Sequence, residues 1–353
     1  MTALVLRSDA GRLPLPDASV DLIVTSPPYF ALRSYQDGGQ HYDGQVGGEP
    51  HWRDFLEALW KVTAECWRVL KPTGSLWVNL GDKYSGAGGP GGDYNAGGLK
   101  DGQPRYGAAD YWSKMAPANT GIRSKSLMGL PWRYALGCID GHADPDGKGW
   151  VLRAEVVWSK PNGMPESVRD RVRRSHEQWF HFTREGSYYA DLDPLRTDVV
   201  PGQSASARTF ARATCPRPES PAGPAQHRAD RDPVPAEHPK GAAPRSVWDV
   251  ATEPLRVPDH LGVDHFAAFP TEFPRRIILG WSPPGGVVLD PFGGTGTTAM
   301  VARAHDRRGI SADLSADYCR LARWRIFHSG GAAKARARTD AAAQMPLDLG
   351  AVS

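Results

Sequence analysis

Short apolar runs and amphipathic stretches alternate along most of the chain. Residues 20–24, 75–80 and 287–290 are strand-length runs rich in Val and Leu, a pattern that predicts buried strands. Between the first two runs, apolar side chains recur at helical spacing over residues 51–70, and Lys71-Pro72-Thr73-Gly74 then ends the pattern. A strand, a helix and a second strand in this order are typical of a parallel sheet with helices packed on it. The chain is therefore predicted to be an α/β protein.

The same two patterns recur in the rest of the chain. They predict further strands at residues 4–6, 150–158 and 308–313, and further helices at residues 127–139, 271–281, 297–305 and 317–327. Thr271 is expected to cap the helix that it begins, with Pro274 in the first turn.

Three segments interrupt this alternation. Residues 85–121 are Gly-rich, with basic and aromatic side chains interleaved, which suits either a nucleic-acid backbone with flipped bases or an ordinary exposed insertion. Residues 191–245 are rich in proline and poor in large apolar side chains, so they are predicted to be loop-rich. Residues 331–353 are rich in Ala and Arg and then polar, and are predicted to be a disordered tail.

Composition narrows the class of protein. The chain has 353 residues, of which 40% are hydrophobic and 23% charged, as is ordinary for a globular protein. Its net charge of +3 permits a nucleic-acid partner without arguing for one. We find no apolar run of membrane-spanning length and no secretory signal, so no membrane association is expected. The four cysteines form no C-x-x-C pair, which disfavours a metal site and favours a cytoplasmic setting.

The first chemical motif is Thr25-Ser26-Pro27-Pro28-Tyr29, directly after the strand predicted at residues 20–24. Two consecutive prolines end a strand, because neither can donate a ladder hydrogen bond and both restrict φ. The result is a rigid turn that carries a hydroxyl group, a backbone carbonyl and an aromatic ring. In open α/β sheets, ligands bind outside the carboxyl ends of the strands, where this turn is predicted to lie.

The second motif is Asp290-Pro291-Phe292-Gly293-Gly294-Thr295-Gly296-Thr297, between a predicted strand and a predicted helix. Glycine there permits positive φ and lets the backbone approach a ligand closely. Asp313 follows about twenty residues later, the spacing of an acid that binds ribose hydroxyls in dinucleotide sites. The spacing of the glycines departs from the G-x-G-x-x-G of nicotinamide enzymes.

Together the two motifs resemble those of the S-adenosylmethionine-dependent amino-methyltransferases of DNA, and their order is similar to that of the permuted β group. The resemblance covers residues 1–184 and 246–328. It implies a Rossmann-like fold with a mixed, mostly parallel seven-stranded sheet, a circularly permuted motif order and a loop-rich insertion. Residues 1–190 and 246–330 would then form the two halves of the catalytic domain. Residues 191–245 lie where β-group relatives carry their target-recognition region.

The resemblance also implies roles for individual residues. Ser26 Oγ and the Pro27 carbonyl would accept the two hydrogens of the target amine, while Tyr29, after Pro28, stacks on a base flipped out of the duplex. Catalysis would come from orientation and electrostatics without a covalent intermediate. The residues implied to bind S-adenosylmethionine are Asp9 near the adenine, Asp313 at the ribose, Asp290 and Gly294 at the methionine end, Phe269 and Phe292 lining the pocket, and Gly296 and Thr297.

A basic stretch lies between the two motifs. Its candidate DNA-binding residues are Lys160, Arg169, Arg171, Arg173, Arg174 and His176. The alternative is a solvated helix face. His176-Glu177 is interpreted as a structural or DNA-facing pair.

The motifs do not decide which base is methylated. Serine in the first position favours N4 of cytosine, with N6 of adenine as the alternative. A C5-cytosine methyltransferase needs a cysteine nucleophile in a suitable turn. Cys215 is the one cysteine beside a proline, and it lies in a low-complexity stretch, so this class of enzyme is disfavoured. An RNA or protein methyltransferase and a non-catalytic DNA-binding module are less favoured hypotheses that the sequence leaves open. The expected partner is double-stranded DNA, with or without a cognate restriction endonuclease, and the chain is expected to be a monomer or a homodimer.

Overall fold

The structure is a computed structural model that describes residues 2–30, 36–37, 40–41, 45–86, 121–163, 165–197, 240–255, 257–263 and 268–344. The chain divides into one unit of residues 1–190 with 246–353 and a second of Asp191–Arg245. Most of the Gly-rich segment, the greater part of the proline-rich segment and the last residues of the predicted tail lie outside the described residues.

The first unit is built on an eight-stranded sheet. Its strands lie in the order β1 (Ala3–Arg7), β10 (Arg308–Asp313), β9 (Val287–Asp290), β2 (Val20–Thr25), β5 (Leu70–Leu80), β7 (His176–Thr183), β6 (Val151–Ser159) and β8 (Val247–Asp249). Neighbouring strands are parallel except at β7, which is antiparallel to both β5 and β6. The predicted mixed, mostly parallel sheet is confirmed.

The sheet has one strand more than the seven expected. Neither β7 nor β8 was predicted from the hydrophobic pattern. In β7 five consecutive residues are buried, but His181 and Thr183 are among them, so the segment shows neither a continuous apolar run nor the alternation of a half-exposed strand. The short β8 buries only Trp248 and pairs only with the end of β6. A separate pair of two-residue strands, β3 (Gln36–Asp37) and β4 (Gln40–His41), is antiparallel.

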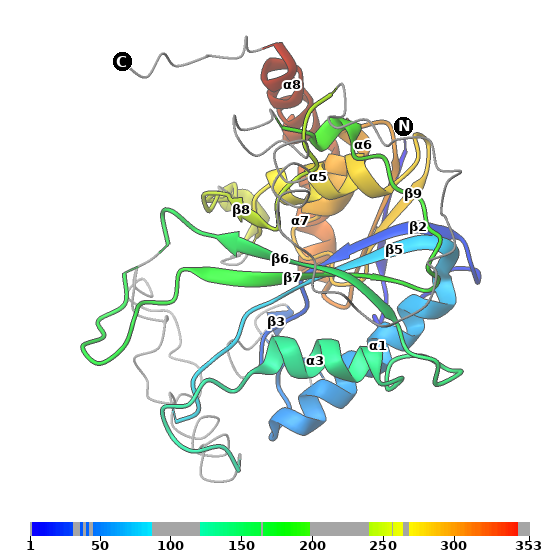
Figure 1. Cartoon of the computed structure of the whole chain (residues 1–353). Helices are drawn as coiled ribbons and strands as arrows, with labels where there is room; N and C mark the ends of the chain where they lie inside the picture. The colour runs from blue at the N-terminus through cyan, green and yellow to red at the C-terminus, as the bar shows by residue number, and fades with distance from the viewer. Residues whose placement is uncertain are drawn as a thin grey trace, which may run out of the picture. The chain divides into compact units, whose positions relative to one another are not determined.

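Helices cover both faces of this sheet. Figure 1 shows α1 (Trp52–Val69) and α3 (Leu130–Ile139) on one side of the strands, and α5 (Glu272–Trp281), α6 (Thr297–Ala304) and α7 (Ala316–Phe327) on the other. Short 3₁₀ turns occur at Asp193–Leu195 and Asp259–Leu261. Throughout the described ranges, no helix is both long and apolar enough to cross a membrane.

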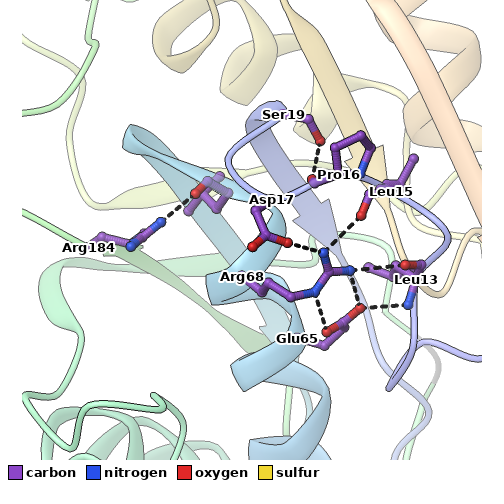
Figure 2. Close-up of polar contacts among 9 residues, drawn as sticks. Leu13, Leu15, Pro16, Asp17, Ser19, Glu65, Arg68 and Arg184 are labelled. Atoms are coloured by element: carbon purple, nitrogen blue, oxygen red, sulfur yellow. Dashed lines mark hydrogen bonds and ion pairs between the residues drawn. The ribbon is translucent and has the colours of Figure 1, made fainter.

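Arg68, near the end of α1, holds the segment that leads into β2. Its guanidinium donates to the carbonyls of Leu13 and Leu15 at 3.0 and 2.9 Å, and it pairs with Glu65 and Asp17 (Figure 2). Glu65 in turn accepts from the backbone N–H of Leu13 at 2.7 Å. These bonds fix the loop between β1 and β2, and so help to fix the start of the strand that carries the first motif.

Two local predictions differ from the structure. The Thr271 side chain makes no capping bond to α5; its hydroxyl and backbone N–H both donate to Glu253. Residues 331–344, expected to be disordered, form helix α8 (Gly331–Gln344). Alanine favours helix, and α8 is anchored where Ala335 is buried and Arg336 donates to the Ala304 carbonyl at the end of α6.

The described residues of the second unit, 191–197 and 240–245, are joined by a bridge between Thr197 and Ala242. Asp193 pairs with both Arg196 and Lys240. The role of this unit in target recognition stays a prediction.

Candidate functional site

Both motifs lie at the carboxyl edge of the parallel strands. Thr25 and Asp290 end neighbouring strands, and Asp313 ends the next strand along the sheet. Because β7 runs in the opposite direction, its amino end reaches the same edge, where Gln178 pairs with Leu80 at the end of β5. The topology therefore brings residues from five segments of the chain to one place.

Asp290 links the two motifs directly. Its Oδ1 accepts from the Thr25 hydroxyl at 2.8 Å, across 265 positions of sequence, and from the Phe292 N–H at 3.1 Å. Its Oδ2 accepts from the Thr298 hydroxyl at 2.9 Å. The side chain is buried, and burial raises the pKa of Asp290 to about 7, although these hydrogen bonds favour the charged form. The Asp290 carboxylate joins strand β2 to the Gly-rich turn, and its expected place at the methionine end of a cofactor stays a prediction.

Ser26 and Tyr29 meet at Asn79, a buried polar residue at the end of β5. Asn79 Oδ1 accepts from Ser26 Oγ at 3.2 Å and from the Tyr29 hydroxyl at 2.9 Å. The Asn79 amide nitrogen donates to the Gln178 carbonyl at 3.0 Å, which fixes the orientation of the side chain. Since the Ser26 proton is directed at Asn79, the lone pairs of Ser26 Oγ are left to accept hydrogen bonds.

The ring of Tyr29 is held at its hydroxyl and along one edge. The hydroxyl lies 2.9 Å from both Asn79 Oδ1 and Glu177 Oε2, and these two acceptors share its single proton. The ring packs against Gly81, where a Cβ atom would lie 2.5 Å from Tyr29 Cε2. Gly47, with φ +93°, approaches the Tyr29 carbonyl in the same way, so residues 45–50 pack on the proline turn. Of these contacts, the sequence predicted only the aromatic ring and its place after the prolines.

Two residues of the Gly-rich turn have the positive φ that glycine permits. Gly294 and Gly296 have φ of 47° and 73°, and the Gly294 N–H donates to Asp313 Oδ2 at 2.9 Å. The backbone of Asp313 also accepts from the N–H of Ser8, which places Asp9 beside it at the end of β1. The structure thus brings Asp9, Gly294 and Asp313 together.

Thr297 follows this turn as the first residue of α6 and is buried. Its hydroxyl is buried and accepts from Arg325 Nη1 at 2.6 Å, and the same nitrogen reaches the Thr295 hydroxyl. Burial lowers the pKa of Arg325 to about 10. The Thr297 hydroxyl therefore stabilises the turn, and its contact with the cofactor stays a prediction. Arg325 was missed because nothing in the pattern of α7 separates it from the exposed arginines nearby.

A family model described as "DNA methylase" (N6_N4_Mtase) matches residues 20–323. The chain belongs to this DNA methylase family. Two relatives are the Type II methyltransferase M.SmaI of Serratia marcescens, 34% identical over 87% of this chain and 84% of the relative, and M.Cfr9I of Citrobacter freundii, 35% identical over 87% and 81%. Among solved structures, the PvuII DNA methyltransferase (cytosine-N4-specific) has the same fold, with a TM-score of 0.58 at 16% identity over 96% of this chain and 93% of that one. The resemblance drawn from the motifs is confirmed.

Phe269 and Phe292, which were expected to line the cofactor pocket, lie in different surroundings. Phe292 follows Asp290 at the start of the turn and packs against the core while remaining half-buried. Phe269 is also half-buried and stands edge-on to Trp179 of β7, with ring centroids 5.6 Å apart. Among the residues that the structure describes, no cluster of His, Cys, Asp or Glu is arranged to hold a metal ion.

The candidate DNA-binding residues of the methylase separate into two groups. Arg169, Arg173 and His176 are exposed, and Arg171 lies over the Tyr84 ring at 4.0 Å while pairing with Glu166. In contrast, Arg174 is largely enclosed, 3.9 Å from Asp82, and Lys160 pairs with Glu177. The alternative of a solvated helix face is wrong, because these residues connect the antiparallel strands β6 and β7.

Proposed function

We propose that the methylase transfers the methyl group of S-adenosylmethionine to N4 of a cytosine that is flipped out of double-stranded DNA. The observation that carries the proposal is the Ser26–Asn79–Tyr29 arrangement at the carboxyl edge of the sheet. It presents a hydrogen-bond acceptor beside a fixed aromatic ring. The Gly-rich turn, joined to it through Thr25 and Asp290, lies at the same edge.

The exocyclic amine of cytosine is a weak nucleophile, because its lone pair is conjugated into the ring. A site that accepts both N–H hydrogens leaves the nitrogen lone pair directed at the methyl donor. Ser26 Oγ is oriented as one acceptor by Asn79, and the Pro27 carbonyl is the second. Tyr29 stacks on the flipped base and replaces the stacking that the base loses on leaving the duplex. These residues lower the barrier by orientation and electrostatics.

The turn residues fit S-adenosylmethionine, which supplies an electrophilic methyl group on a sulfonium centre. Glycine at position 294 lets the backbone approach the cofactor without a side-chain clash, whereas Gly296, where a Cβ atom would lie 3.0 Å from Ala322 Cβ, lets the turn pack on α7. Asp313 accepts backbone N–H groups from Gly294 and Ser315, and its oxygens have further lone pairs for the ribose hydroxyls. We assign Asp9 to the adenine end and Phe269 and Phe292 to the walls.

Double-stranded DNA is the proposed substrate, with Arg169, Arg173 and His176 as the residues that reach its backbone. A cognate restriction endonuclease is proposed as the functional partner, since the relatives are Type II methyltransferases. N6 of adenine is the second candidate target, because the family model is named for both amines.

Transfer of labelled methyl groups to unmethylated genomic DNA, followed by digestion to nucleosides, tests the proposal. We expect N4-methylcytosine as the labelled product. The S26A variant should lose transfer while retaining cofactor binding, and S187A, at an exposed serine, is the matched control. Label found only in N6-methyladenine would overturn the cytosine assignment. Cofactor binding without transfer to any DNA would favour a non-catalytic DNA-binding module.

A further inference from the structure

The side chain of Lys160 is largely enclosed by the protein, whereas a lysine that binds a DNA phosphate is expected to be exposed. Its ammonium group pairs with Glu177 Oε1 and lies 4.1 Å from the centroid of the Trp158 ring. The side chains of Lys160 and Glu177 are only 20% and 17% exposed. The lysine charge is therefore satisfied within the protein, in contrast to the exposed Arg169 and Arg173 a few residues further along.

The second oxygen of Glu177 accepts from the Tyr29 hydroxyl at 2.9 Å. Lys160, Glu177 and Tyr29 thus form a continuous row that starts at the end of β6 and finishes at the proline turn. A hydrogen bond to a carboxylate is stronger than one between neutral groups. Asn79 Oδ1 is a second acceptor for the same proton, and Gly81 packs against the ring, so the ring has little freedom to turn.

The same pair lies where the segment that connects β6 to β7 begins and ends. The Lys160 N–H donates to the Ser175 carbonyl at 2.9 Å, which joins the two ends of that segment. The segment between these residues carries Arg169 and Arg173. The ion pair therefore lies where the segment that carries the exposed arginines joins the two strands.

We propose that Lys160 and Glu177 are positioning residues, which hold the Tyr29 ring in the plane required by the flipped base. This inference rests on the proposed function. Lys160 neutralises the half-buried carboxylate, and Glu177 fixes the phenol. Lys160 then acts on methyl transfer through Tyr29 and does not act as a phosphate ligand.

The two roles of Lys160 predict different measurements. Removing a lysine that contacts a phosphate reduces the slope of log K against log salt for DNA binding by about 1. Removing a positioning lysine leaves that slope unchanged and lowers the rate of transfer at saturating DNA. A residue that only stabilises the fold would instead change the melting temperature and cofactor affinity.

The experiment uses the full chain, S-adenosylmethionine and a duplex that the wild type modifies. We expect K160M, E177Q and Y29F each to lower the single-turnover rate by about 10-fold or more, with cofactor affinity and the salt slope unchanged. K160R, which keeps the charge, should retain most of the rate. The matched control R169M should reduce the salt slope by about 1.

The double variant Y29F/E177Q tests whether Glu177 acts through the phenol. We expect it to be no slower than the slower single variant, because both changes act on the same contact between the phenol and residue 177. Additive losses, or a reduced salt slope with an unchanged rate in K160M, would overturn the inference. A wild-type chain that transfers no methyl group to DNA would instead refute the proposed function. In that case the salt slope of K160M would still report whether Lys160 binds phosphate.

Discussion

Asp290 is the buried carboxylate through which the two motifs meet, and Asn can replace it with little change of shape. In D290N the remaining oxygen can accept from Thr25 and from the Phe292 N–H. The new amide can donate to the Thr298 hydroxyl, which lies 3.3 Å from the Val24 carbonyl and can donate there. The variant therefore removes the titration of residue 290 while preserving its network of hydrogen bonds.

The expected effect of this change depends on pH. Burial raises the pKa of Asp290 from 3.8 to about 7, so the folded protein holds the proton to higher pH than the unfolded chain does. The contribution of this group to stability is complete below the unfolded pKa and is lost as pH rises through the folded pKa. Between pH 5 and 8 this loss amounts to roughly 3 kcal/mol in the free energy of unfolding.

Urea unfolding of the wild type and D290N at several pH values measures this difference. The stability of D290N relative to wild type should rise between pH 5 and 8, because Asn has no charged form to bury. Other titrating groups cancel in the comparison, and D146N, at an exposed aspartate, controls for the loss of a charge. Parallel pH profiles for wild type and D290N would refute the reasoning that burial governs this carboxyl group.

Further predictions concern the contacts that hold the site. G81A should displace the Tyr29 ring and lower methyl transfer at least 10-fold with cofactor affinity retained, measured by single-turnover assay and calorimetry; an unchanged rate would contradict the close packing. T25V leaves the buried Asp290 without one donor and should lower the free energy of unfolding by about 1–3 kcal/mol, whereas T25S should restore most of it. R68M should lower the free energy of unfolding, measured with urea, by about 1–3 kcal/mol, because two backbone carbonyls and Glu65 lose their donor. A loss of stability no larger than that of a surface substitution would contradict this prediction.

The secondary structure that could be predicted is the part with a local physical cause. Helix α1 follows from apolar side chains at helical spacing, and β2 and β9 follow from short apolar runs ended by proline or glycine. Strand β7 has no such signal, because polar residues such as His181 and Thr183 interrupt its buried run and its partner strands are far away in sequence. Helix α8 was missed because its few anchoring contacts lie in the tertiary structure.

The two motifs and their place at the ends of buried strands were determined by the sequence alone. Proline ends a strand and glycine permits positive φ wherever they occur, so the proline turn and the Gly-rich turn need no distant partner to form. The partners of their side chains were decided only by the tertiary structure. The bonds from Ser26 to Asn79, from Tyr29 to Glu177 and from Thr25 to Asp290 join residues 53, 148 and 265 positions apart. No local spacing encodes such contacts, because they arise from the order and direction of strands in the folded sheet.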